Sequence, residues 1–153
     1  MRFLIDGYNL LHAVWPAEGR HVRARTLPRF RQRLLDRLRD RHATRAGAVT
    51  VVFDASRSPP RGSAEETSGD VRVRFAVGYP SADDLIEELI RTDSVPARLT
   101  VVTDDRRLRE AARRRGCVVE GCLDYIENLE RPPPAEPAKG PPAKVSERQD
   151  VKG

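Results

Sequence analysis

The sequence predicts an α/β fold with three layers, in which helices cover both faces of a central, mainly parallel β-sheet. Short apolar runs typical of buried strands alternate along the chain with longer segments whose apolar residues recur at helical spacing. Three of these runs are followed directly by an aspartate: Asp6, Asp54 and Asp104. In an open parallel sheet, ligands bind at the edge formed by the carboxyl ends of the strands. The pattern therefore gathers carboxylates where a functional site is expected.

The composition indicates one folded domain followed by a tail. Of the 153 residues, 39% are hydrophobic but only 5% are aromatic, so aliphatic side chains must build most of the core. The net charge of +5 at pH 7 favours an anionic partner, although a general arginine bias would give the same charge. We expect residues 1–131 to form the domain and the proline-rich residues 132–153 to form a disordered tail.

No segment of the sequence has the pattern of a signal peptide or a membrane span. The apolar run at the N-terminus reaches Asp6 too early for a signal peptide, and no run approaches the roughly 20 apolar residues that cross a bilayer. We therefore expect a cytoplasmic protein with no membrane partner. Cys117 and Cys122 match neither a zinc ribbon nor a redox motif, so both are expected to be reduced, with Cys117 in the core.

The first half of the chain is predicted to form two strands and two helical segments. The opening strand covers residues 3–5, and a short helical turn follows at 10–15. A long helix is expected within 26–47, and the second strand covers 49–53. The outer face of the long helix is predicted to be a solvated surface with ion pairs or an RNA contact. Its basic residues are Arg29, Arg31, Arg33, Arg37, Arg39 and Arg41.

The second half begins with residues 55–69, which have no apolar period and are predicted to form a functional or mobile loop. Residues 71–75 alternate apolar and basic, which is typical of a half-buried strand with its arginines on one face. The remaining pattern predicts a helix at 81–92, a strand at 99–103, a helix from Asp104 or Asp105 to Gly116, a strand at 117–119, and a final helix through 123–129.

Right-handed crossovers bring the carboxyl ends of parallel strands to one edge, which would gather Asp6, Asp54, Asp104 and Asp105 there. Asp83 would join them from the start of its helix. Each aspartate alone also fits an ordinary turn or helix cap. Together they would repel one another, and Mg²⁺ or Mn²⁺ suits such an all-oxygen set. A bound metal of this kind can activate water and stabilise charge on a scissile phosphate.

Other protein classes that place carboxylates at strand ends fit less well. A haloacid-dehalogenase-type phosphatase would need a second aspartate where this chain has Tyr8, and no strand-end lysine of a receiver domain can be placed. Glycine-rich loops that cradle nucleotides are absent from the sequence.

Four segments resemble the motifs of the YacP-like NYN-domain proteins, a branch of the PIN-like nucleases. They are Leu4-Ile5-Asp6-Gly7-Tyr8-Asn9-Leu10, Val52-Phe53-Asp54, Ser81-Ala82-Asp83-Asp84-Leu85-Ile86 and Val102-Thr103-Asp104-Asp105. The resemblance covers roughly residues 2–129. It implies a PIN-like (NYN) α/β/α domain with metal-dependent endoribonuclease activity, which in some members is ribosome-associated mRNA cleavage.

The resemblance also implies roles for individual residues. The expected catalytic residues are Asp6, Asn9, Asp83 and Asp105. Metal ligands are expected among Asp6, Asp54, Asp83, Asp104 and Asp105. Because Asp104 stands beside Asp105 and Asp84 beside Asp83, which member of each pair would contact the metal stays open.

Two functional hypotheses follow. The first is a Mg²⁺- or Mn²⁺-dependent endoribonuclease acting on mRNA or structured RNA, with or without the ribosome. The second is a non-catalytic RNA- or ribosome-binding module with the same fold. In the first, basic residues near the acidic edge would hold the RNA backbone. The candidates are Arg57, Arg61, Arg72, Arg74, Arg106 and Arg107.

Overall fold

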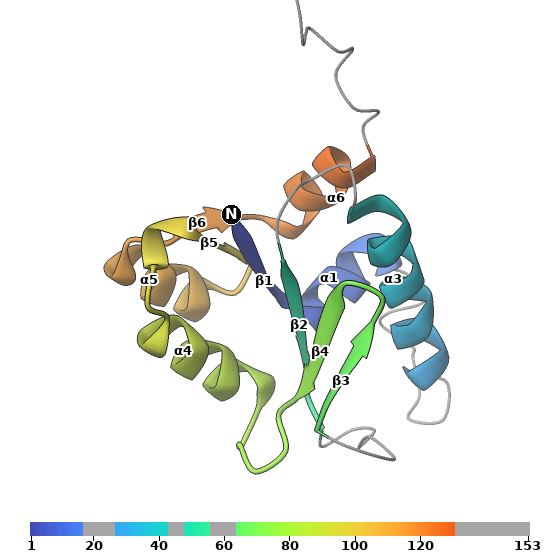
Figure 1. Cartoon of the computed structure of the whole chain (residues 1–153), viewed down its shortest axis with the longest axis horizontal. Coiled ribbons are helices and arrows are strands. Elements are labelled where there is room, and N and C mark those ends of the chain that lie inside the picture. The colour runs from blue at the N-terminus through green and yellow to red at the C-terminus, as the bar shows by residue number, and fades with distance from the viewer. Residues whose placement is uncertain (17–26, 43–47, 56–63, 131–153) are drawn as a thin grey trace, which may run out of the picture.

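The computed structural model describes residues 1–16, 27–42, 48–55 and 64–130 of the chain. These residues form a six-stranded sheet between two layers of helices (Figure 1). Helices α1, α3 and α6 cover one face of the sheet, and α4 and α5 cover the other. This arrangement confirms the predicted three-layer α/β fold.

The sheet has the strand order β3-β4-β2-β1-β5-β6. Every neighbouring pair is parallel except β3 and β4. In the centre, Ile5 of β1 lies beside Val51 of β2 and Val102 of β5, so these three strands end at the same edge. The strands are β1 (Arg2–Asp6), β2 (Val49–Phe53), β3 (Glu65–Ser68), β4 (Val71–Phe75), β5 (Leu99–Val102) and β6 (Val118–Glu120).

Alternation along the central strands divides the core between the two helical layers. Ile5 and Val51 pack toward α1, α3 and α6, whereas Leu4 and Val52 pack toward α4 and α5. Central strands are therefore apolar on both faces, as parallel sheets require. The helices are α1 (Gly7–Val14), α3 (Leu27–His42), α4 (Ala82–Thr92), α5 (Arg106–Arg115) and α6 (Cys122–Glu130), with a short 3₁₀ turn at Pro96–Arg98.

One strand was not predicted. Glu65–Ser68, expected to be part of a loop, forms the edge strand β3 and pairs antiparallel with β4. Its side chains are mostly exposed, so it carries no apolar alternation that could reveal it. The turn into β4 contains Gly69 at φ 62°, a left-handed conformation that favours glycine.

The first helix is longer than predicted, because α1 begins at Gly7, directly after β1. A Cβ atom at Gly7 would lie 2.5 Å from the ring of Phe53. Glycine here therefore allows the start of α1 to approach β2 closely. Both predicted limits of the long helix, residues 26 and 47, and the proline-rich tail lie outside the described residues. No helix in the described ranges is long and apolar enough to cross a membrane.

Candidate active site

A cavity of about 290 Å³ opens at the carboxyl ends of the central strands, and we call it the acidic cleft. It brings together five residues that the sequence predicted from separate segments. These are Asp6, Asn9, Asp54, Asp83 and Asp105. The remaining lining residues are Tyr8, His12, Ser81 and Ala82.

Asp6 is the most buried carboxylate of the cleft, with 8% of its surface exposed. It is the last residue of β1 and stands at the N-cap position of α1. The hydroxyl of Thr103, which follows β5, donates a 3.2 Å hydrogen bond to Asp6 Oδ2. The same hydroxyl oxygen accepts the backbone N–H of Asp105 at 3.0 Å. Thr103 thus links two of the acids. It belongs to the fourth motif, but no role was predicted for it from the sequence.

Asp83 and Asp105 are both placed by the first turns of helices. Asp105 caps α5, since its Oδ1 accepts the N–H of Leu108 at 3.1 Å. Asp83 lies in the first turn of α4, which is capped by Ser81. Helix N-termini favour negative charge, so both positions are also sound for local stability.

The carboxylates of the cleft destabilise one another's charged forms. Burial, followed by the negative charge of Asp83, raises the pKa of Asp6 to about 7, although hydrogen bonds from Thr103 and the Asn9 backbone lower it. Burial and the charge of Asp105 likewise raise the pKa of Asp83. Among the described residues, no lysine or arginine lines the cleft. The site therefore concentrates negative charge that Arg107 offsets in part at Asp83, and such perturbed carboxylates are typical of functional sites.

The donor set fits a hydrated divalent cation. In the described part of the chain, no three His, Cys, Asp or Glu side chains converge tightly enough to hold a metal through protein ligands alone. Mg²⁺ does not need such a cage, because it usually keeps several waters and binds through one or two carboxylates. Asp6, Asp83 and Asp105 supply oxygen atoms of this kind in one cleft.

In each pair of adjacent aspartates, one member lines the cleft and the other makes a contact elsewhere. Asp104 does not line the cleft; its Oδ1 accepts the N–H of Cys122 at 3.1 Å, at the start of α6. Asp84 accepts hydrogen bonds from Ser81, at 2.9 Å, and from Arg107, at 2.8 Å. The structure therefore places Asp83 and Asp105 in the cleft and gives their neighbours local structural contacts.

Asn9 connects the cleft to α6. Its Oδ1 accepts the backbone N–H of Asp104 at 3.0 Å and the thiol of Cys122 at 3.2 Å. Burial, followed by the charges of Asp104 and Asp6, raises the pKa of the Cys122 thiol, so the thiol remains protonated at neutral pH. Both cysteines are buried and reduced, and Cys117 lies in the core as predicted.

The predicted RNA-binding arginines are distributed over two surfaces. Arg57 and Arg61 lie outside the described residues. Arg106 and Arg107 are in the first turn of α5, where Arg107 pairs with Asp84 and Glu87. Arg106 is exposed.

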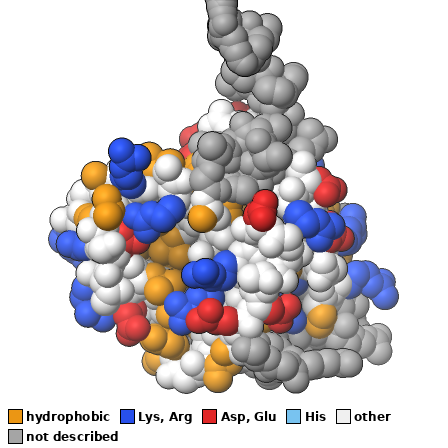
Figure 2. Space-filling view, viewed as in Figure 1, with side chains coloured by type: hydrophobic (Ala, Val, Ile, Leu, Met, Phe, Trp, Pro, Cys, Tyr) orange, Lys and Arg blue, Asp and Glu red, His pale blue; other side chains and the backbone are white. Residues whose placement is uncertain are grey.

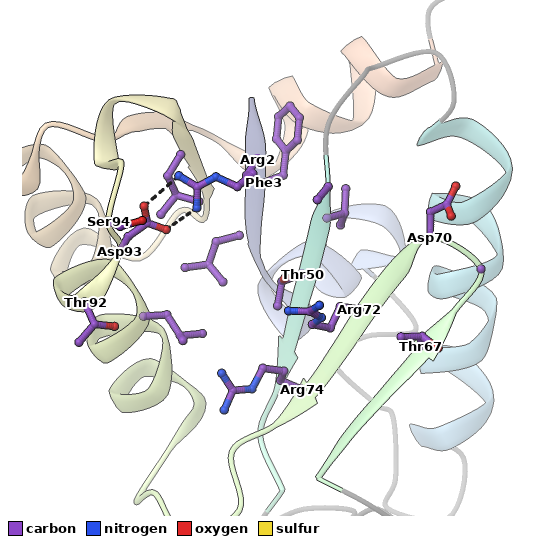
Figure 3. A pocket seen from close by; sticks show the side chains of 16 residues that line it. Arg2, Phe3, Thr50, Thr67, Asp70, Arg72, Arg74, Thr92, Asp93 and Ser94 are labelled. Carbon is purple, nitrogen blue, oxygen red and sulfur yellow. Dashed lines mark hydrogen bonds and ion pairs between the residues drawn. The ribbon is translucent and has the colours of Figure 1, made fainter.

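Arg72 and Arg74 extend from β4 toward α4 in a second hollow, a groove of about 510 Å³ that we call the sheet-face groove (Figure 3). On the same face of the molecule, basic side chains lie beside apolar surface (Figure 2). Arg74 lies beside Val52 in the sheet, two residues before Asp54. Residues two apart on a strand are separated by about 6.6 Å. Along the strand direction, Arg74 is therefore about that far from the position of Asp54.

Arg31 corrects the prediction for the long helix. The sequence pattern placed it on a solvated face, but it is only 8% exposed. Its guanidinium lies 5.0 Å from the ring centroid of Phe75 and 5.8 Å from that of Phe53, and it donates to the hydroxyl of Tyr8 at 3.1 Å. Position 31 precedes the buried Leu35 by four residues, so helical periodicity would have placed it on the inner face.

A three-layer domain with an acidic cleft at the carboxyl ends of a mainly parallel sheet has the architecture of the PIN-like nuclease folds. Within that class, the chain belongs to the YacP-like NYN domain family, whose sequence model matches residues 3–134.

Two solved structures are similar to this chain. They are the crystal structures of Rae1 (YacP) from Bacillus subtilis and of its W164L mutant, each 24% identical to the chain. Both matches cover 85% of this chain; they cover 74% of the first protein and 76% of the mutant, with TM-scores of 0.69 and 0.64. At this identity the likeness shows a shared fold. No curated protein matches the sequence.

Proposed function

We propose that this protein is a metal-dependent endoribonuclease that hydrolyses phosphodiester bonds of RNA. The observation that carries the proposal is the convergence of Asp6, Asp83 and Asp105 in one cleft, with raised pKa values for the first two. Placing these charges together costs free energy that a bound divalent cation would offset. Membership of a PIN-like nuclease family supports RNA as the substrate.

In this proposal, Asp6, Asp83 and Asp105 hold Mg²⁺ or Mn²⁺ through direct or water-mediated contacts, and Asp54 lies at the rim of the same cleft. The cation, when bound, would activate water and neutralise charge developing on the phosphate. Thr103 keeps Asp6 and Asp105 in their relative positions through its two hydrogen bonds. Asp104 contributes to the site through the backbone, because its N–H orients Asn9.

Arg72, Arg74 and Arg106 are proposed to hold the RNA backbone. In the described part of the chain, the guanidinium groups of Arg72 and Arg106 have no ion-pair partner. Arg74 is paired with Glu65 at 3.4 Å. Arg107 is a weaker candidate than the sequence suggested, because two acids already engage it.

We extend the proposal to mRNA bound to ribosomes in the cytoplasm, on the strength of the family resemblance. Cosedimentation of the protein with ribosomes would test this extension separately from cleavage. The folded domain is proposed to end near residue 131, leaving the proline-rich segment outside it, and limited proteolysis should stop near that boundary.

A non-catalytic RNA-binding module is the alternative function. The acidic cleft argues against it, because clustered carboxylates repel phosphate and would weaken binding without providing chemistry.

The deciding experiment incubates purified protein with end-labelled RNA in Mg²⁺, in Mn²⁺ and in EDTA. Cleavage should require the metal and leave 5′-phosphate and 3′-hydroxyl ends. Asp6→Asn, purified in the same way, controls for contaminating nuclease. Binding of RNA without metal-dependent cleavage would favour the alternative function.

A further inference from the structure

The amide of Asn9 is held on the wall of the acidic cleft by two donors from distant parts of the chain. Its Oδ1 accepts the N–H of Asp104, which follows β5, at 3.0 Å. It also accepts the thiol of Cys122, the first residue of α6, at 3.2 Å. Cys122 is completely buried and stands 113 residues from Asn9 in the sequence.

These contacts determine which way the amide faces. A backbone N–H can only donate, so the atom opposite Asp104 must be the amide oxygen and not the NH₂ group. The nitrogen Nδ2 then occupies the other branch of the planar amide. It donates to no residue in the described ranges, and it is not among the buried polar atoms without a partner, so solvent can reach it. Because Asn9 lines the acidic cleft, Nδ2 is available to a ligand there.

Cys122 is also held by a second hydrogen bond, through its backbone. The N–H of Cys122 donates to Asp104 Oδ1 at 3.1 Å, so Asp104 and Cys122 are joined to each other as well as to Asn9. A Cβ atom at the preceding Gly121 would lie 3.2 Å from the same Oδ1, which shows how closely the chain approaches here. The backbone of Cys122 is therefore held near Asn9 through Asp104 as well as through the thiol.

We propose that Asn9 donates its Nδ2 hydrogens to a non-bridging oxygen of the bound phosphodiester, and that Cys122 is a positioning residue that holds the amide in this orientation. The identity of the ligand rests on the proposed nuclease function. The neighbouring carboxylates offer the phosphate only acceptors, so a neutral donor fixed among them supplies a bond that they cannot. If the amide were reversed, its oxygen would face the phosphate and repel it.

The kinetic test compares Cys122→Ala, which removes the donor, with Cys122→Ser, which keeps one. The hydrogen bond from Asn9 strengthens as negative charge grows on the phosphate oxygen in the transition state, so loss of about 1 kcal/mol there corresponds to roughly a fivefold fall in kcat, with KM little changed. The serine variant should recover most of this loss. Cys117→Ala is the matched control, because it removes a buried thiol from the opposite core layer and should keep the parental kcat.

A second readout follows the amide itself and needs no cleavage. The chain contains two asparagines, Asn9 and Asn128, so ¹⁵N-asparagine labelling gives two side-chain NH₂ pairs in a ¹H–¹⁵N spectrum. Cys122→Ala should shift the Asn9 pair and leave the Asn128 pair in place, whereas Cys117→Ala should move neither. Adding a short single-stranded RNA oligonucleotide with Mg²⁺ to the Asp83→Asn variant, in which cleavage is expected to be slow, should also shift the Asn9 pair.

The outcomes separate this inference from the proposed function. If the parental protein fails to cleave RNA, the nuclease proposal fails, while the spectra still decide whether Cys122 orients Asn9. If the Asn9 pair does not move in Cys122→Ala, the positioning role is overturned. That result is expected if the thiol donates to the nearby Asp104 carboxylate and not to Asn9. Equal losses of kcat in the alanine and serine variants would also overturn it, since they would indicate packing. Should the alanine variant not fold, Cys122→Val removes the donor while filling the space.

Discussion

Asp83 and Asp84 are neighbours on the first turn of α4, yet they belong to two carboxylate clusters with opposite electrostatics. Asp83 faces the acidic cleft, where burial and Asp105 raise its pKa. Asp84 faces α5, where hydrogen bonds from Arg107 and then Ser81 lower its pKa. Glu87 shares Arg107 with Asp84, and its pKa is also lowered. We call Asp84, Glu87 and Arg107 the clamped cluster.

The comparison shows that a carboxylate's role depends on the cation opposite it. In the clamped cluster Arg107 pairs with both carboxylates and offsets one of their two charges, and partly exposed pairs of this kind contribute little to stability. Asp6 in the cleft is buried, and among the described residues no lysine or arginine lines the cleft; the charge of Arg107 offsets part of the rise in the pKa of Asp83. A fold retains such repulsion where function requires it, at a cost in stability. The cleft is therefore the expected site of catalysis. The clamped cluster provides a control, because the same substitution made there should not affect catalysis.

The largest expected effect comes from making the same substitution in each cluster. Asp83→Asn should lower the cleavage rate by roughly 10²- to 10³-fold, the loss typical when one preorganised group that stabilises transition-state charge is removed. Asp84→Asn should stay close to the parental rate, because Asp84 faces away from the cleft. Single-turnover rates at saturating metal provide the measurement. Similar rates for the two variants would abolish the distinction between the clusters.

The second expected effect concerns stability without metal. Because the folded state raises the pKa of Asp6 to about 7, the unfolded chain loses this proton first as the pH rises. The free energy of unfolding should therefore fall between about pH 4 and pH 7, by up to roughly 4 kcal/mol from this group. Asp6→Asn removes the penalty, so in EDTA it should be more stable than the parent at pH 8 and nearly equal to it at pH 4.

Two comparisons sharpen this measurement, which is made by denaturant unfolding across pH. Asp84→Asn should have the opposite sign: its depressed pKa stabilises the fold at neutral pH and loses that contribution as the pH falls. Mn²⁺ should raise the melting temperature of the parent more than that of Asp6→Asn. A destabilised Asp6→Asn variant at pH 8 would show that the cleft is not electrostatically strained.

The smallest expected effect concerns the cations that complement the cleft. Replacing Arg72 and Arg74 by alanine should weaken RNA binding and flatten the dependence of log K on log salt concentration by roughly 0.7 for each arginine. The chemical step at saturating RNA should change little. Arg113→Ala, on the exposed surface of α5, is the control. An unchanged salt slope in the double variant would exclude the sheet-face groove from the RNA path.

The sequence by itself determined the layers and the location of the site. Alternation with period two in the strands, and apolar spacing in the helices, reflects local geometry that each segment imposes on its own side chains. Aspartates directly after 3–5, 49–53 and 99–103 had to lie at the same edge of the sheet once those strands were parallel. The motif order then indicated the family. An edge strand such as Glu65–Ser68 escaped because exposed side chains carry no such pattern.

Only the tertiary structure decided which of two adjacent residues enters the cleft. Asp104 and Asp105 have the same chemistry, and the difference lies in their partners: α6 engages Asp104, while Asp105 caps α5. Arg107 is neutralised by acids 20 and 23 residues away, and Asn9 is oriented by a thiol 113 residues away. Contacts between segments so distant along the chain depend on how the layers pack. Local patterns encode the direction of a side chain but not the group that it meets.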